Sequence, residues 1–375
     1  MNPKKLFIAV LVLLILAGGT LFFYNFYFKK WAEPSQDQGN QTPKEYSFKP
    51  KPITQEAIFA PAIDEDGRTI KYYTAQNGHV FKVSFDGSSL EPVYLTDLPD
   101  LVKITWSPDK TKVIGIFDSQ NTIKKNVYDF NTKTVSWLNE NIKWIDWSPD
   151  SQRIVYQFQT GDKQKNSISI ANPDGSQWRD IFQTRLENLV VEWPVPDKIS
   201  LRNVPSGTSP GSLFVIDPDS GSLNKILTDF YGLSVKWSPD GQQILFQSTD
   251  EKGKNLKSLV APASGSQPRE LPLTTIAEKC VWSADSINIF CAVPQIISAN
   301  AVWPDDYFSG RLIIKDDFYI INSATLEKTK IASSDDIQSF DAQNLVLSPQ
   351  EDYLFFINRL DGFLYSIGIK ETAIQ

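Results

Sequence analysis

The chain has 375 residues, is 41% hydrophobic and carries a formal net charge of −7. This composition is typical of a globular protein. The excess of acidic residues argues against a nucleic-acid partner, which requires clustered Lys and Arg. Two cysteines and a single histidine offer no set of metal ligands, so neither a metal nor another cofactor is expected.

The first segment predicts a membrane anchor. Residues 6–28 carry no charge, and lysines flank them on both sides. A helix of this length spans roughly 34 Å, enough to cross a hydrocarbon core of about 30 Å. Aromatic residues near its end suit a membrane–water interface. We predict a short cytoplasmic tail at residues 1–5 and a single-pass transmembrane helix, a signal-anchor, at residues 6–28.

A cleaved secretory signal is the alternative, because Ala17-Gly18-Gly19 provides small residues after an apolar run. The apolar character continues past these glycines, whereas a signal peptide has a shorter apolar region. A weak excess of positive charge on the tail favours an extracytoplasmic location for the rest of the chain. Residues 29–43 are polar with Pro and Gly, which predicts a flexible stalk.

From residue 44 onward, one short turn recurs about every 40–45 residues, with several strand-like runs in each interval. This period is the signature of a β-propeller. The strong copies read Trp-Ser-Pro-Asp and the weaker copies keep the same outline. In chain order the copies are Ile63–Gly67, Trp106–Asp109, Trp147–Asp150, Trp193–Asp197, Trp237–Gly241, Trp282–Asp285 and Leu347–Gln350.

The residue types of this turn satisfy the positions of a type I β-turn, with Ser first, Pro second and Asp third. The preceding Trp is expected to fill the gap between neighbouring blades as a structural anchor. These anchors are Trp106, Trp147, Trp193, Trp237 and Trp282. We predict an all-β domain at residues 44–375 with seven blades, or six as the alternative.

The last repeat supplies three clear strands. We therefore expect the segment near Glu45–Pro50 to add the fourth strand, which closes the ring and covers an exposed edge. Cys280 and Cys291 lie on either side of the Trp282–Asp285 turn, so the hairpin places them near one another. A disulfide and two free buried thiols are both compatible with this spacing.

No catalytic constellation is evident. Gly207–Gly211 matches the G-x-S-x-G pattern of hydrolases, but a strand-like run follows it and the single histidine, His79, lies far upstream. We interpret it as a polar hairpin loop. Acidic residues meeting across a central channel could serve a glycosidase, but sequence alone cannot bring two of them together.

The interval before the last turn is about 20 residues longer than the others. The extra residues, approximately 294–315, combine aromatic side chains with carboxylates. Such an insertion lands on one face of a propeller and often binds a partner; a cover for the channel mouth or a blade edge is the alternative. The candidate partner-binding residues are Trp303, Pro304, Asp305, Asp306, Tyr307 and Phe308.

The Trp-Ser-Pro-Asp turns at Trp106, Trp147 and Trp237 resemble the repeats of bacterial TolB-type, WD40-like (PD40) β-propellers. The resemblance covers about Gln55 to Ile369. It implies a propeller fold and an extracytoplasmic setting. Such propellers serve as interaction platforms and as accessory domains of serine peptidases, so the resemblance implies little about activity.

The sequence therefore favours a non-catalytic, membrane-tethered extracytoplasmic β-propeller that binds a protein or cell-envelope ligand as a scaffold. The alternative is an extracytoplasmic enzyme that acts on carbohydrate or peptide with acidic residues in its channel. Activity on glycans, abolished by an Asp→Asn change in the channel, would favour the second hypothesis.

Overall fold

A computed structural model describes residues 49–161, 165–335 and 338–369. The chain divides into two compact units, and Tyr46–Gln375 contains all of the described residues. The predicted tail (1–5), transmembrane helix (6–28) and stalk (29–43) lie outside the described residues. Within the described part, no helix has the length and apolar character needed to cross a membrane.

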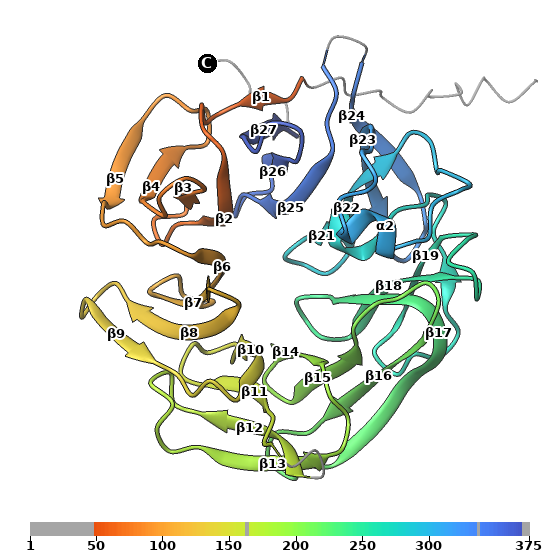
Figure 1. Cartoon of the computed structure of the whole chain (residues 1–375). Coiled ribbons are helices and arrows are strands. Elements are labelled where there is room, and N and C mark those ends of the chain that lie inside the picture. The colour runs from red at the N-terminus through yellow and green to blue at the C-terminus, as the bar shows by residue number, and fades with distance from the viewer. Residues whose placement is uncertain (1–48, 162–164, 336–337, 370–375) are drawn as a thin grey trace, which may run out of the picture. The chain divides into compact units, whose positions relative to one another are not determined.

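The described residues form antiparallel sheets placed around a common centre (Figure 1). Four consecutive strands make each of the sheets β2–β5, β6–β9, β10–β13 and β21–β24. Their bounds are β2 (Ile58–Ile63), β3 (Thr69–Thr74), β4 (Val80–Ser84), β5 (Leu90–Tyr94), β6 (Leu101–Trp106), β7 (Lys112–Ser119), β8 (Thr122–Asp129), β9 (Thr134–Trp137), β10 (Ile142–Trp147), β11 (Ile154–Phe158), β12 (Asn166–Ala171), β13 (Arg179–Thr184), β21 (Cys280–Trp282), β22 (Asn288–Pro294), β23 (Asp316–Asn322) and β24 (Lys328–Ser333).

One sheet contains seven strands, in the order β14 to β20. Strand β17 is 15 residues long; its first part pairs with β16 and its second part with β18. Two repeat units are therefore joined through a single strand. The bounds are β14 (Leu189–Val195), β15 (Lys198–Asn203), β16 (Pro210–Ile216), β17 (Leu223–Trp237), β18 (Gln243–Thr249), β19 (Lys257–Pro262) and β20 (Arg269–Glu270).

The remaining sheet joins the two ends of the described chain, in the order β1-β27-β26-β25. Lys51 pairs with Ser366 and Pro52 with Tyr365. The prediction that an N-terminal segment supplies the outer strand of the last repeat is confirmed, although the pairing residues immediately follow the predicted range. The bounds are β1 (Lys51–Pro52), β25 (Ala342–Leu347), β26 (Tyr353–Asn358) and β27 (Leu364–Gly368).

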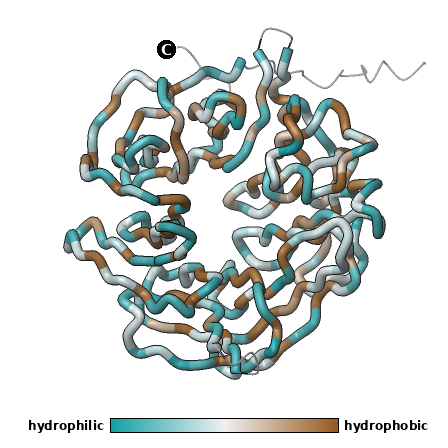
Figure 2. Tube along the Cα trace, viewed as in Figure 1, coloured by the Kyte–Doolittle hydropathy of each residue, from teal (hydrophilic) through white to brown (hydrophobic). Residues whose placement is uncertain are grey.

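The expected all-β architecture is confirmed, with two short helical segments, η3 (Ala277–Lys279) and α2 (Asp305–Phe308), among the described residues. Hydrophobic residues are distributed over all the sheets and are not confined to one side (Figure 2). The core is accordingly a series of clusters between neighbouring sheets. One cluster, for example, joins Phe290 and Phe318 of the β21–β24 sheet to Leu354 and Phe356 of β26.

The recurrent turn is held by the same contacts in each strong copy. Ser107 Oγ donates to Asp109 Oδ1 at 2.6 Å and accepts the Lys112 N–H at 2.9 Å. The residue after the Asp has a left-handed backbone, with φ of 62° at Lys110. A type I turn followed by one left-handed residue matches the twist of the strands that it joins. The same Ser–Asp contact recurs at Ser148–Asp150, Ser238–Asp240 and Ser283–Asp285.

Three anchor tryptophans are bonded to the preceding repeat, as expected for side chains that fill gaps between sheets. Trp106 Nε1 donates to Ala60 O at 2.7 Å, and Trp147 Nε1 donates to Thr105 O at 3.0 Å. Trp282 Nε1 donates to Lys236 O at 3.3 Å. Trp147 and Trp282 are buried and Trp106 is half-buried, and each indole N–H has a hydrogen-bond partner.

The two remaining anchors depart from this pattern. Trp193 Nε1 bonds within its own turn, to Pro196 O at 3.4 Å. Trp237 Nε1 has no hydrogen-bond partner among the described residues. The strand that Trp237 would contact, β14, has a register shift between Glu192 and Val195. This shift coincides with the degenerate Trp-Pro-Val-Pro-Asp copy of the turn.

Candidate functional site

The inner strands of the repeats surround a cavity of about 950 Å³ at the centre of the ring. Its walls come from β6, β10, β14, β15, β17, β21 and β25 together with η3 and α2. Much of the lining is apolar, including Trp144, Val190 and Val281. Six charged side chains also line it: Lys103, Asp146, Glu192, Arg202, Lys236 and Glu278.

The charged residues of the cavity are partly bonded to one another and to the backbone. Glu192 Oε1 accepts from Arg202 NH2 at 3.3 Å, and Asp146 Oδ2 accepts the Trp193 N–H at 3.0 Å. Lys236 Nζ donates to the Cys280 carbonyl at 2.5 Å. These contacts fix side chains from different repeats in a shared, partly apolar space.

Hydrogen-bonding capacity remains unused in this cavity. Among the described residues, Arg202 Nε and NH1 and Glu278 Oε2 are buried atoms without a hydrogen-bond partner. The other oxygen of Glu278 accepts from Ser234 Oγ. A buried guanidinium or carboxylate without partners is unfavourable, so such groups mark places where a bound molecule gains binding energy.

The cavity shifts the pKa values of two groups in ways useful for recognition or proton transfer. Burial, together with the negative charge of Glu192, raises the pKa of Asp146 to about 6, although the Trp193 N–H opposes the shift. Burial lowers the pKa of Lys236, and the carboxylates of Glu278 and Glu192 oppose that shift. A carboxyl that titrates near pH 6 beside a second carboxylate can exchange a proton near neutral pH.

Register shifts occur on the strands that line the cavity, between Leu101 and Lys103 in β6 and between Ile142 and Ile145 in β10. A third shift begins at Glu192 in β14. An extra residue on one strand re-aims the neighbouring side chains, and such bulges are frequent beside functional sites.

The insertion at 294–315 lies between β22 and β23 and carries α2. Trp303 is 2% exposed and Tyr307 is 5% exposed; both pack in a cluster with Leu256 and Ile276. Buried aromatic rings cannot serve as a partner-binding surface, so their packing favours a covering role for this part of the insertion. Phe308 differs, because it is 48% exposed and lines the central cavity.

Polar contacts fasten the insertion to two other repeats. Asp305 Oδ2 accepts the Gly207 N–H at 2.6 Å, and the Trp303 N–H donates to Gly253 O at 2.8 Å. A Cβ added at Gly207 would lie 2.2 Å from Trp303 O, so the close approach requires glycine. The expected hairpin loop at Gly207–Gly211, which includes the first two residues of β16, is therefore a contact for the insertion. Asp306 and Pro304 belong to the same short segment, where Asp306 Oδ2 accepts the Val302 N–H at 2.7 Å.

Beneath the insertion lies a buried ionic cluster, formed by Lys279, Asp316, Asp341 and Arg359. Lys279 Nζ is 2.8 Å from both Asp316 Oδ2 and Asp341 Oδ1. Arg359 NH1 is 3.1 Å from Asp341 Oδ2, and both cations lie over the Tyr307 ring. Burial raises the pKa of Asp316 to about 6 despite the Lys279 charge. The cluster ties α2 to the last two sheets.

Cys280 and Cys291 are cross-strand partners in β21 and β22, with 4.1 Å between their Cα atoms, and the structure joins them in a disulfide. His79 lies apart from the cavity and its Nε2 is 2.8 Å from Asp97 Oδ1. Among the described residues, no cluster of His, Cys, Asp and Glu of a size that could hold a metal ion is found.

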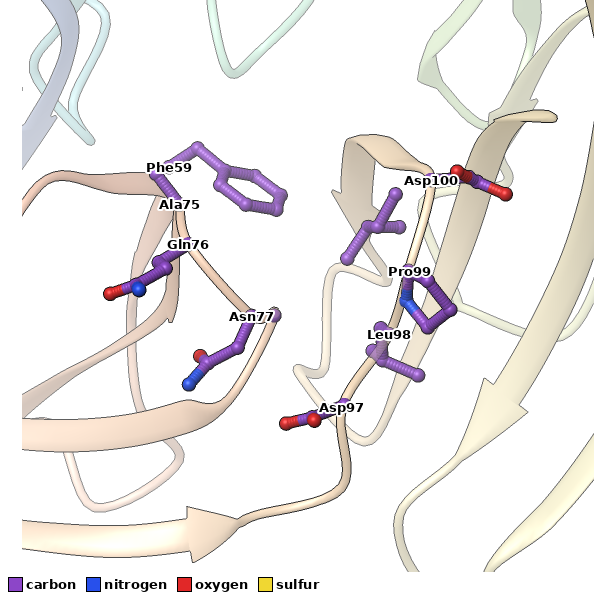
Figure 3. A pocket seen from close by; sticks show the side chains of 10 residues that line it. Phe59, Ala75, Gln76, Asn77, Asp97, Leu98, Pro99 and Asp100 are labelled. Carbon is purple, nitrogen blue, oxygen red and sulfur yellow. The ribbon is translucent and has the colours of Figure 1, made fainter. Parts of the chain in front are cut away.

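A second hollow of about 270 Å³ lies between the loop after β3 and the connection from β5 to β6 (Figure 3). The Phe59 ring faces this groove, and Asn77 and Asp97 approach it from the two sides. It is smaller than the central cavity and contains fewer charged groups. The central cavity is therefore the stronger candidate.

Sequence reasoning did not identify the channel residues, although a signal was present. Side chains alternate along a strand, so a Trp that faces the neighbouring sheet places the preceding residue on the other face. The residues that precede four anchors are Thr105, Asp146, Glu192 and Lys236, and all four line the central cavity.

No protein-family model matches the chain, and no curated protein gives a significant match. Its structure is similar to that of an oligogalacturonate lyase in complex with manganese, with 12% identity, a TM-score of 0.61 and coverage of 87% of this chain and 97% of that chain. An oligogalacturonate lyase from Vibrio parahaemolyticus matches with 10% identity, a TM-score of 0.60 and coverage of 88% and 99%.

The β-propeller domain of the Trilobed protease from Pyrococcus furiosus matches with 12% identity, a TM-score of 0.55 and coverage of 84% and 96%. These likenesses define the class of protein: the chain is a β-propeller, as the repeat period predicts. At such low identity they establish the fold alone.

The comparisons also correct one prediction. The absence of a recognised motif led us to expect no enzymatic activity, but the same fold occurs in two lyases. That expectation is therefore not supported. The expectation was weak because a propeller can build a site from residues of several repeats, and no contiguous sequence motif reveals such a site. The six charged residues of the cavity illustrate this, because they come from β6, β10, β14, β15, β17 and η3.

Proposed function

We propose that this chain is a TolB-type propeller of seven blades that binds a protein or cell-envelope ligand in its central cavity. The seven recurrent turns and the division of the long sheet at β17 support the blade number. The observation that carries the binding function is the convergence of six charged side chains, some with unused hydrogen-bonding atoms, in one cavity of about 950 Å³.

We further propose that residues 6–28 tether the propeller to the membrane on its extracytoplasmic side. The uncharged apolar run supports the tether. The Cys280–Cys291 disulfide supports the location, because disulfides persist in oxidising compartments. Protease protection in intact cells tests the location: the propeller is digested by external protease if the proposal holds and is protected if it fails.

Site-specific photo-cross-linking in cells tests the binding function. A photoreactive residue in place of Phe308, at the cavity, is expected to capture a ligand. The same residue in place of Trp178, which is 64% exposed and does not line the cavity, serves as the matched control. Capture from position 308 and not from position 178 supports the proposal, and equal capture from both positions contradicts it.

A second candidate function, turnover of a carbohydrate or peptide, is favoured by the pair Asp146 and Glu192. The raised pKa of Asp146, about 6, suits a proton donor beside a second carboxyl group. Activity is then expected to fall as pH rises above about 6, and Asp146→Asn is expected to abolish it. Asp219→Asn, at an exposed turn, serves as the control. Activity that survives Asp146→Asn excludes this role.

A further inference from the structure

Among the described residues that line the central cavity, Arg202 has the most hydrogen-bond donors without a partner. The residue is 7% exposed, and Glu192 contacts NH2 while Nε and NH1 have no partner among the described residues. Of the five N–H donors of an arginine, Nε carries one and NH1 two. Three charged donors are thus left to be satisfied at a buried position, where the cost of an unpaired group is largest.

The chemistry of a guanidinium defines its preferred ligand. It is planar and permanently charged, and it matches the geometry of a carboxylate better than an ammonium does. Glu192 fixes one end of the group, which orients the remaining donors before a ligand arrives. A carboxylate on the bound molecule would satisfy these donors and would form charge-assisted hydrogen bonds.

Apart from Glu192, the cavity-lining residues that neighbour Arg202 on its own strand and on the paired strand are apolar. The cross-strand partner of Arg202 is Val190, and Val204 and Pro205 follow Arg202 in the chain; all three line the cavity. Phe308 of the insertion lines the same cavity. An acidic sugar presents hydroxyl groups around its carboxylate, and these would find few polar partners on such a wall. A carboxylate flanked by apolar side chains is the better complement.

We propose that the ligand of the central cavity is a peptide segment whose carboxylate is bound by Arg202 and whose apolar side chains pack on Val190, Val204 and Phe308. Glu278 Oε2 offers a further acceptor for a peptide N–H. The carboxylate belongs to the peptide C-terminus or to an acidic side chain. This inference rests on the proposed binding function and adds the class of ligand and the residue that selects it.

Fluorescence anisotropy with the full-length chain in detergent micelles tests the inference. The probes are three pools of labelled random nonapeptides: one without Asp or Glu and with a free C-terminus, one without Asp or Glu and amidated, and one amidated with a single Asp. We expect a carboxylate-containing pool to bind at least tenfold more tightly than the amidated pool without Asp. The pool that does so identifies the source of the carboxylate.

Substitutions at Arg202 then assign the preference to this residue. Arg202→Leu is expected to reduce the affinity of the preferred pool at least tenfold, and Arg202→Lys is expected to retain part of it. Arg68→Leu, at an exposed turn outside the cavity, is the matched control and is expected to change nothing. If Arg202→Leu does not fold, Arg202→Gln provides the same comparison with a polar side chain of similar length.

Equal binding of all three pools, binding of none of them, or an undiminished preference in the Arg202 variants would each overturn the inference. Cross-linking from Phe308 separates this failure from failure of the proposed function. Capture at position 308 without a carboxylate preference is consistent with the proposed binding function but contradicts the proposal that the ligand is a peptide carboxylate. If neither capture at position 308 nor a carboxylate preference is observed, both the proposed binding function and the proposed peptide ligand are contradicted.

Discussion

Within each repeat unit, the turn between the first and second strands and the loop between the second and third strands differ in how much they vary. The turn between the first and second strands is nearly the same in every strong copy and is held by local Ser–Asp contacts. The loops between the second and third strands vary from the two residues Gln120-Asn121 to the insertion at 295–315. Regular turns maintain the fold, whereas the variable loops differ between repeats and contribute Val204, Pro205 and Phe308 to the lining of the central cavity.

Loss of the buried cation Lys279, beneath the insertion, is expected to have the largest effect on stability. Lys279→Met would leave Asp316 and Asp341 without their shared partner at a fully buried position. We expect a loss of about 3–5 kcal/mol in the free energy of unfolding, measured by urea denaturation. Lys257→Met removes an exposed ion pair with Glu270 and should cost less than about 1 kcal/mol. Similar effects for both variants would contradict a special role for the cluster.

The contact between the insertion and its neighbours is the next target. Gly207→Ala would place a methyl group 2.2 Å from Trp303 O, so the insertion must shift. We expect a destabilisation of about 1–3 kcal/mol and a change in tryptophan fluorescence. Gly368→Ala, where a Cβ meets nothing within 4 Å, is the control. An unchanged emission spectrum in Gly207→Ala would show that the insertion is not fixed by this contact.

At the anchor tryptophans that precede the recurrent turns, a pair of substitutions measures how much one hydrogen bond contributes to stability. Trp147→Phe removes the indole N–H that Thr105 accepts, while Trp237→Phe removes an N–H without a partner among the described residues. Both lose similar apolar area, so Trp147→Phe should be the more destabilising by about 0.5–1.5 kcal/mol. Equal losses in urea denaturation would show that the anchors act through packing alone.

The smallest effect is expected from the turns and depends on pH. The Ser148 hydroxyl, with the Gln152 N–H, lowers the pKa of Asp150 in the folded protein. A lowered folded pKa adds stability above the unfolded value, and this contribution disappears as pH falls through the folded pKa. Asp150→Asn should therefore lower the melting temperature at pH 7 and have less effect at pH 3. Asp219→Asn is the control. A difference that does not depend on pH would exclude ionisation as its cause.

The regular features could be predicted because they are local. The turn residues, the anchor Trp spacing and the cross-strand position of Cys280 and Cys291 each follow from a few neighbouring side chains. The insertion could be located but not interpreted, because Trp303 is buried by packing on residues of other repeats, such as Leu256. The pairing of Asp146 with Glu192 escaped prediction because the two residues come from different strands of the ring.

The repeat, the strand-rich fold and the closure of the last sheet by the N-terminal segment could all be inferred from the amino-acid sequence. Each of these depends on patterns within one repeat unit or on counting the units. The folded structure was needed to show which side chains meet in the central cavity and which aromatic residues of the insertion are buried. The physical reason is that these contacts join residues far apart in the chain, and their energies depend on a dielectric environment that exists only after the ring has closed.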